Sequence, residues 1–415
     1  MEQNEKKKNN NEESGFLNKY MKPIILVATA IIIVFTMFGR LTAIVDQIAN
    51  DRANQVITDY LQSNQNAINL DDKKEELTGN AIENVVVDSE KITPNDFSAM
   101  TENAKKAMVT VNNYQKITHT DINGNTQTSQ QLAGSGSGVI IGDNGEELWI
   151  LTNQHVIDSA RKLTIQFADN STVDACTKGF DSQNDIAVLS ISLSSLSEET
   201  KKSIGVINIG DSTKIKSGQT VIAIGNVLGK GQAVTKGIVS IAKTEVNMGV
   251  DKNVQMIQID AAINEGNSGG ALLNVDGELI GIPTAKIVET TVENVGYAIP
   301  ISEVRSLVET FCARESRKLA SDSEEAYLGI EVVEVPLGVL VQKIDNHSPA
   351  YKSKLSVGDY IVQMDDQKIT TTSELLSELW YHKAGEIVTL KVMRPEGKAY
   401  TTYTLTITLE RNPNK

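Results

Sequence analysis

The sequence predicts a mostly β protein in which a large β domain is followed by a smaller one and preceded by a single transmembrane helix. Residues 105–308 carry many short β-branched runs separated by Gly, Asn, Asp and Ser, which is typical of a barrel or a sandwich rather than of a βαβ fold. Residues 327–411 repeat this pattern on a smaller scale around one helix. Residues 24–38 contain no charge and are strongly apolar.

Length and composition limit the possible functions. A chain of 415 residues can hold two or three domains. Its net charge of −14 argues against a nucleic-acid partner, because phosphates would be repelled and no local basic face is evident in the folded region. With only Cys176 and Cys312, a disulfide framework or a structural zinc site is not expected. We predict two buried thiols, with a single bridge as the alternative, and neither a metal nor a cofactor.

The N-terminal part predicts an anchored chain. Residues 1–22 are polar and lysine-bearing, so they should form a disordered tail. Residues 23–43 are long enough for a transmembrane helix, although the uncharged core is short and leaves a cleaved signal peptide or a buried helix as alternatives. The long polar leader and the lack of a small-x-small cleavage site favour an uncleaved anchor. The lysines before it place the tail in the cytoplasm and the rest of the chain outside the cell membrane.

Residues 44–100 are expected to separate the membrane from the folded part. Within them, residues 45–61 have apolar positions at helical spacing and could form a short stalk. Residues 62–96 are rich in Asn, Asp, Glu and Lys, with one apolar island at 82–87. We interpret this stretch as a spacer.

The large β domain contains a turn suited to nucleophilic chemistry. Residues 266–270 read Gly-Asn-Ser-Gly-Gly and surround the hydroxyl of Ser268 with residues that allow a sharp turn. Such a turn can present a nucleophile and direct successive N–H groups at an oxyanion. The alternative is an ordinary Gly-rich turn, since Gly, Asn and Ser fill turns for conformational reasons alone.

Two further side chains strengthen the catalytic interpretation. His155 ends an apolar run, and Asp185 begins another. The order His, Asp, Ser is one of three known for serine hydrolases, and it belongs to the double-barrel enzymes. Taken singly, His155 could be a core histidine and Asp185 a turn residue, but together the three predict a triad with Ser268 as nucleophile, His155 as general base and Asp185 as its orienting carboxylate.

Several motifs together resemble one family. TNQHVI at 152–157, NDIAVL at 184–189, AAINEGNSGGALLN at 261–274 and VGYAIP at 295–300 resemble the HtrA, or Deg, family of serine proteases, from about Ala107 to the C-terminus. The resemblance implies a chymotrypsin-like double β-barrel over 101–314, a linker over 315–326 and a PDZ domain over 327–412. A helix over 302–311, capped by Ser302, should close the protease domain.

The resemblance also implies roles for individual residues. The backbone N–H groups of Gly266 and Ser268, aided by Asn267, would form the oxyanion hole. The position six residues before the serine is Ala262, which offers no counter-charge to a basic P1 side chain, and Ile263 suggests small or medium aliphatic P1 residues. The expected substrate pocket comprises Ala262, Ile263, Ile282 and Thr284. Pro283 departs from the usual family pattern and cannot donate a backbone hydrogen bond.

The smaller β domain is expected to bind peptides. A small barrel with a groove-lining helix can accept an added strand from a peptide, and Thr371-x-x-Glu374 predicts a capping box at the start of that helix. The resemblance makes the segment Tyr327, Leu328, Gly329 and Ile330 a loop that binds peptide C-termini.

The resemblance implies an ATP-independent endopeptidase that degrades unfolded or damaged proteins and assembles as a homotrimer or a higher oligomer. Asn267 stands where zymogens of trypsin-like enzymes use an aspartate, so control by loop rearrangement is expected. Two alternatives stay open: a signalling protease that cuts one membrane partner, and a PDZ-based adaptor or chaperone with a latent triad.

Overall fold

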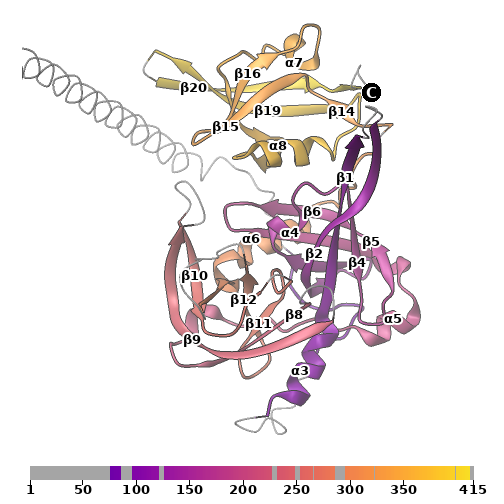
Figure 1. Cartoon of the computed structure of the whole chain (residues 1–415), viewed down its shortest axis with the longest axis vertical. Helices are drawn as coiled ribbons and strands as arrows, with labels where there is room; N and C mark the ends of the chain where they lie inside the picture. The colour runs from indigo at the N-terminus through magenta and orange to yellow at the C-terminus, as the bar shows by residue number, and fades with distance from the viewer. Residues whose placement is uncertain are drawn as a thin grey trace, which may run out of the picture. The chain divides into compact units, whose positions relative to one another are not determined.

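The computed structural model describes most of the chain from residue 75 onward (Figure 1). The described ranges are 75–85, 96–120, 126–226, 231–247, 253–264, 266–285, 295–321, 323–397 and 399–411. The predicted tail over 1–22, the transmembrane helix over 23–43 and the stalk over 45–61 lie outside these ranges. Within them, no helix is long and apolar enough to cross a membrane.

The first half of the large domain is a seven-stranded antiparallel sheet with the order β5-β4-β1-β2-β3-β7-β6. Its strands are β1 (Met108–Thr120), β2 (Thr126–Asp143), β3 (Glu147–Thr152), β4 (Lys162–Gln166), β5 (Thr172–Asp174), β6 (Cys176–Asp181) and β7 (Ile186–Ser192). The neighbouring strands β3 and β7 are buried along almost their whole length. Strands covered on both faces come from nearly continuous apolar runs, here LWIL and IAVLSI, rather than from alternating ones.

The second half closes into a barrel with the order β10-β13-β12-β11-β8-β9. Its strands are β8 (Thr220–Asn226), β9 (Gln232–Asn247), β10 (Asn253–Ile259), β11 (Ala271–Leu273), β12 (Leu279–Thr284) and β13 (Gly296–Pro300). A closed ladder leaves no unpaired strand edge. Among the described strands, the closed ring of hydrogen bonds belongs to this half.

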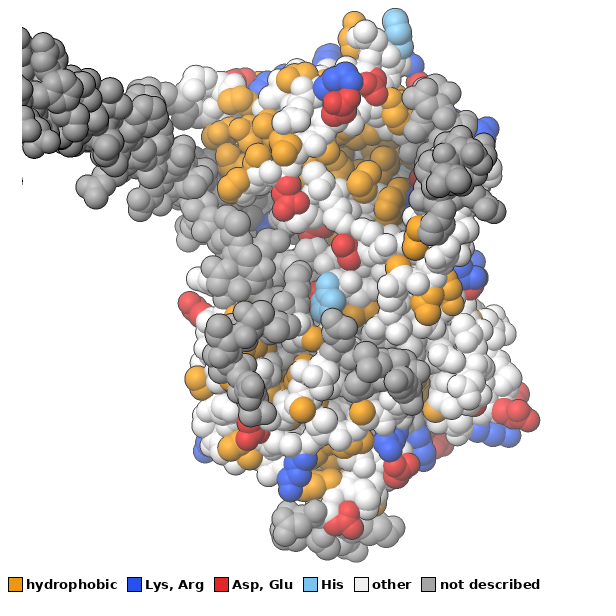
Figure 2. All heavy atoms as spheres, in the orientation of Figure 1, with side chains coloured by type: hydrophobic (Ala, Val, Ile, Leu, Met, Phe, Trp, Pro, Cys, Tyr) orange, Lys and Arg blue, Asp and Glu red, His pale blue; other side chains and the backbone are white. Residues whose placement is uncertain are grey.

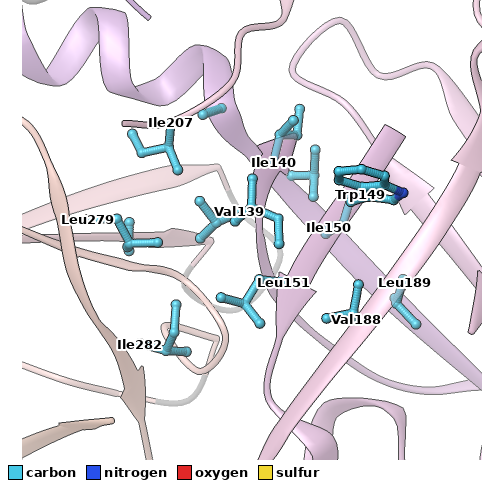
Figure 3. Packing of buried hydrophobic residues seen from close by; sticks show 14 of the residues in the cluster. Val139, Ile140, Trp149, Ile150, Leu151, Val188, Leu189, Ile207, Leu279 and Ile282 are labelled. Atoms are coloured by element: carbon cyan, nitrogen blue, oxygen red, sulfur yellow. The ribbon is translucent and has the colours of Figure 1, made fainter. Parts of the chain in front are cut away.

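One hydrophobic core spans both halves (Figure 3). Val139, Trp149 and Leu151 of the first sheet belong to the same cluster as Leu279 and Ile282 of β12, and all five are fully buried. The second barrel has an additional smaller core of its own. Because burying one large apolar side chain contributes about 1.5–3 kcal/mol, the shared cluster makes the two halves depend on each other.

Short helices connect and cover these strands. They are α3 (Ser98–Ala104), α4 (Gln154–Ile157), α5 (Glu198–Ser203) and α6 (Ile301–Ala313), with 3-10 turns η3 (Lys105–Ala107), η4 (Leu193–Ser195) and η5 (Ser212–Lys214). The predicted closing helix is α6, and it packs against strands of both halves. It begins at Ile301, so Ser302 is not its N-cap as predicted. The Ser302 hydroxyl instead accepts the Ser212 N–H at 3.0 Å.

Residues 75–85, which we call the strap, are packed on the large domain. They fall within the range predicted as a spacer, 44–100, and this part of the prediction was wrong. The apolar side chains of Leu77, Ile82 and Val85 are buried in the domain core. The fully buried carboxylate of Asp143 accepts the N–H groups of residues 80, 81 and 82 at 2.9, 2.8 and 3.1 Å. Asn84 also forms a parallel bridge with Val206.

The C-terminal domain is a small β domain with a separate core. Its elements are β14 (Ala326–Tyr327), β15 (Ile330–Val335), β16 (Gly338–Ile344), α7 (Pro349–Lys352), β17 (Tyr360–Met364), β18 (Gln367–Lys368), α8 (Thr372–Leu379), β19 (Ile387–Glu396), β20 (Ala399–Thr408) and β21 (Glu410–Arg411). Strand β15 is at the edge of the main sheet, and α8 lies beside it (Figure 1). The capping box is confirmed, because Thr371 accepts the Glu374 N–H at 3.1 Å and the Glu374 carboxylate accepts the Thr371 N–H at 2.9 Å.

The predicted linker over 315–326 is hydrogen-bonded to folded elements. The backbone of Arg317 exchanges two hydrogen bonds with Thr177 of β6, at 2.9 and 3.0 Å. At its other end, Ala326 belongs to β14, which pairs with β21. The C-terminal domain therefore begins one residue earlier than predicted.

Candidate active site

His155 and Asp185 are joined by direct hydrogen bonds. His155 lies in α4, directly after β3, and Asp185 directly precedes β7. Because β3 and β7 are paired, the ends of these strands bring the two residues together. The imidazole Nδ1 lies 2.9 Å from Oδ2 and 3.0 Å from Oδ1 of Asp185. An acceptor-only carboxylate at Nδ1 requires the proton there, which leaves Nε2 able to accept a proton.

The Asp185 carboxylate is fully buried and well supplied with donors. Besides the ring, it accepts the backbone N–H of His155 at 3.0 Å and the hydroxyl of Thr284 at 3.0 Å. The Asn153 side-chain amide holds the Asp185 carbonyl at 2.8 Å. A buried charge needs such partners, because desolvation without them would be costly. The arrangement keeps the carboxylate fixed against the imidazole.

Ser268 lies in a tight turn between β10 and β11. Gly266 and Gly269 have φ angles of 96° and 79°, a left-handed conformation that glycine adopts without strain. A Cβ added to Gly269 would lie 2.3 Å from both the Ser137 carbonyl oxygen and the Thr152 hydroxyl. The Gly269 N–H donates to the Pro283 carbonyl at 3.1 Å. Gly269 is thus required by both conformation and space, and Gly266 by conformation.

Ser268 and His155 line one cavity of about 480 Å³, together with Gly266 and Ala285. In this structure the Ser268 Oγ accepts the Ala285 N–H at 2.9 Å. Among the described residues, no hydrogen bond joins the Ser268 hydroxyl to His155. The nucleophile and base candidates therefore share a space, while the hydroxyl is engaged by the segment after β12. Catalytic hydrogen bonds are often loose before substrate binds.

The four predicted pocket residues divide into two groups. Ala262 is exposed and Ile263 is half-buried, and a Cβ on Gly296 would lie 2.7 Å from the Ile263 side chain. These two remain candidates for the pocket wall. Ile282 and Thr284 do not, because Ile282 is fully buried in the shared core (Figure 3) and the Thr284 hydroxyl binds Asp185.

Thr284 is a partner of the buried carboxylate, a role that was not predicted from the sequence. Its only sequence signal was a position inside an apolar strand, and all six residues of β12 are buried. A strand buried on both faces gives no alternation from which the direction of one side chain could be read.

The predicted carboxylate-binding loop of the C-terminal domain leads into β15. Gly329 has a φ of 79°, and a Cβ there would lie 2.2 Å from the Ser348 Cβ. Leu328 is buried, and the Tyr327 hydroxyl donates to Asp345 at 2.5 Å, which raises the pKa of Tyr327 to about 12. Hydrophobic side chains gather on the visible face of this domain (Figure 2). A fixed loop beside an edge strand is the geometry that strand addition requires.

Cys176 and Cys312 are both free thiols, so the disulfide alternative does not apply. Cys312 is buried, but Cys176 is only partly buried, unlike the prediction. Burial raises the pKa of both thiols above the ordinary value, so neither is an activated nucleophile. Within the described ranges, no three His, Cys, Asp or Glu side chains form a group that could hold a metal ion.

Comparisons with known proteins agree with this geometry. Residues 136–282 match the trypsin-like peptidase domain family, and residues 326–409 match the PDZ domain family. The serine protease Do-like HtrA of Bacillus subtilis is 35% identical over 336 residues, which cover 76% of this chain and 72% of the relative. This chain belongs to the HtrA family of serine proteases. Another HtrA, from Lactococcus lactis, is 32% identical and covers 74% of this chain and 81% of its own length.

The periplasmic serine endoprotease DegP of Salmonella typhimurium is 33% identical over 67% of this chain and 58% of its own. HtrA membership, with a trypsin-like and a PDZ domain, confirms a serine endopeptidase of mostly β, chymotrypsin-like fold. The expectations of a chymotrypsin-like protease domain and of a PDZ domain are therefore confirmed, whereas among the described strands only the second half of the protease domain closes into a barrel.

Proposed function

We propose that His155, Asp185 and Ser268 form the catalytic triad of a membrane-anchored HtrA endopeptidase that cleaves misfolded or damaged proteins outside the cytoplasmic membrane. The observation that carries this proposal is the contact of His155 with both oxygens of a fully buried Asp185, together with the cavity that His155 and Ser268 line. Anchoring by residues 23–43 is supported by their sequence alone, as is an N-terminus in the cytoplasm.

The mechanism follows from the roles that these atoms can take. Nε2 of His155 accepts the Ser268 proton during attack on the scissile carbonyl and returns it to the leaving amine. Asp185 stabilises the imidazolium without becoming protonated. The N–H groups of Gly266 and Ser268 bind the oxyanion, each worth about 2.7–4 kcal/mol in the transition state. The Ala285 N–H has to leave the Ser268 hydroxyl before attack.

The preferred P1 residues are those with small or medium aliphatic side chains. Ala262 brings no carboxylate to the pocket region, and the half-buried Ile263 packs close to Gly296. An Arg or Lys side chain would therefore lose water without gaining a counter-charge. Peptides with Val or Ala at P1 should be cleaved faster than the same peptides with Arg.

The PDZ domain is proposed to bind apolar peptide C-termini. The backbone N–H groups of residues 327–330 would hold the carboxylate, while the peptide adds a strand to β15. Binding would raise protease activity by favouring the active arrangement of the turn. Assembly as a homotrimer or a higher oligomer is proposed on family grounds.

Casein digestion tests the proposed function. A fragment beginning at residue 75, which retains the strap, should digest casein, and the matched Ser268→Ala fragment should not. Equal digestion by both fragments would show that the nucleophile is wrongly assigned. The engagement of Ser268 by Ala285 favours a latent adaptor as the second candidate. An intact Ser268 fragment that binds apolar C-terminal peptides yet stays inactive with them would support it.

A further inference from the structure

Ser137 is a fully buried residue of β2 to which the proposed chemistry gives no role. It lies in the GSGSG stretch over 134–138. Its backbone N–H donates to the Ser268 carbonyl at 2.8 Å, and its hydroxyl donates to the Gly266 carbonyl at 2.6 Å. Ser137 thus holds the catalytic turn at two points, one on either side of Asn267.

The direction of the Ser137 hydroxyl is fixed by a third contact. The backbone N–H of Asn226, at the end of β8, donates to Ser137 Oγ at 2.7 Å. Because a hydroxyl has one proton, this contact occupies an acceptor site and leaves the proton for Gly266. The Ser137 carbonyl is held in turn by the Thr152 hydroxyl at 2.7 Å. Ser137 therefore links both halves of the protease domain to the turn.

Gly266 needs such an external hold. It has no side chain, and its φ of 96° lies in a region that glycine enters and leaves freely. Fixing its carbonyl restricts rotation of the residue whose N–H is expected in the oxyanion hole. The end of β8 also packs closely against the turn, since a Cβ added to Gly225 would lie 2.8 Å from the Asn267 Cα and 3.0 Å from Ser137 Oγ.

We infer that Ser137 is a positioning residue for the oxyanion hole, because its hydroxyl fixes the Gly266–Asn267 peptide and its backbone N–H fixes the Ser268 carbonyl, so the turn that carries the N–H groups of Gly266 and Ser268 is held on both sides. This inference rests on the proposed role of Ser268. Ser137 contacts no substrate, so its removal should weaken stabilisation of the transition state and leave ground-state binding nearly unchanged.

The test compares Ser137→Ala with Ser190→Ala in the full-length chain. Ser190 is a matched control, since it is also buried in the first sheet and its hydroxyl is hydrogen-bonded to Ser316 at 2.5 Å. Loss of an oxyanion donor itself costs about 10²–10³ in kcat, so an indirect loss at Ser137 should lower kcat about 10- to 100-fold with KM within about threefold. Ser190→Ala should leave both values unchanged.

A second readout isolates the oxyanion. A peptidyl trifluoromethyl ketone forms a hemiketal with Ser268 whose oxygen occupies the oxyanion hole, so its affinity should fall in parallel with kcat. Ser137→Cys keeps a side-chain donor, although a weak one, and it should give an intermediate kcat, even if Ser137→Ala folds poorly. Equal kcat and equal ketone affinity for Ser137→Ala and Ser190→Ala would overturn the inference. Activity that persists in Ser268→Ala would instead overturn the proposed function.

Discussion

Asp185 shows how one buried carboxylate organises the site at the scale of single residues. Its oxygens accept hydrogen bonds from the His155 ring, the His155 backbone and Thr284. Of these three donors, only the ring can also act as the base. The role of Thr284 is therefore to hold the carboxylate, and this role can be separated experimentally from a role in the substrate pocket.

Thr284→Val should lower kcat/KM about 10-fold without changing the preference among P1 residues. The change removes a hydrogen bond to a charged group, worth about 1.5–3 kcal/mol, while the two ring contacts of Asp185 remain. The measurement is hydrolysis of a peptide series that varies only at P1. Ile263→Ala is the control, and it should shift the P1 preference. A shifted preference in Thr284→Val would return Thr284 to the pocket.

At the scale of elements, the strap is the part of the structure that the sequence concealed. Its apolar residues formed an island in a polar stretch. The carboxylate that accepts the backbone N–H groups of the strap belongs to Asp143, which is 63 positions from Asn80 in the sequence. A buried carboxylate that serves backbone N–H groups carries no local sequence signal. The catalytic turn was predictable for the opposite reason, because its glycines meet conformational demands within five consecutive residues.

Asp143→Asn should release the strap and leave the catalytic constants unchanged. The Asp143 carboxylate accepts four backbone N–H groups, three from the strap and one from Gly145. An asparagine presents an NH₂ group in place of one of these acceptors, and the loss should be about 2 kcal/mol of local stability. Hydrogen exchange at residues 80–82 measures the opening directly. Asp169→Asn serves as the control, since Asp169 accepts from Ser171 and Thr200 and makes no contact with the strap. Unchanged exchange in Asp143→Asn would exclude the carboxylate as the clamp.

At the scale of the whole molecule, the distribution of cores predicts how the protein unfolds. The two halves of the protease domain share one cluster, whereas the PDZ domain has its own. The fold class and the domain order were predictable from strand runs and turns. The shared hydrophobic cluster was not predictable, because no sequence pattern shows which barrel strand packs its side chains against the neighbouring sheet.

Ile282→Ala should destabilise the complete protease domain by about 2–5 kcal/mol, because it opens a cavity in the shared cluster. Calorimetry should show the protease transition at a lower temperature and the PDZ transition unmoved. Leu390→Ala, in the PDZ core, should give the reverse. Separate transitions for the two protease halves would contradict a shared core.

His382 should make the stability of the PDZ domain depend on pH. Burial of the imidazole disfavours its charged form, but Glu378 at 3.6 Å, Glu386 at 3.1 Å and Asp365 at 3.4 Å outweigh this effect and raise the pKa of His382. A raised pKa stabilises the fold fully below the unfolded value of about 6.5. This contribution is lost as the pH rises through the folded pKa.

The unfolding temperature of the PDZ domain should therefore fall between pH 6 and pH 9. His382→Gln should make this temperature less dependent on pH. The exposed His347 provides the control, and His347→Gln should keep the slope of the unsubstituted protein. An identical slope in His382→Gln would assign the pH dependence to other groups.

The strap also determines which contacts would resist a mechanical pull on the protease domain. A pull on the chain from its N-terminal side reaches residues 80–82 and the bridge at Val206 before it reaches β1. The Asp143 clamp would therefore bear load before β1 does, and the segments that carry His155 and Ser268 would be shielded until it ruptures. The spacing of His155 and Ser268 would therefore stay unchanged under any pull that the strap withstands.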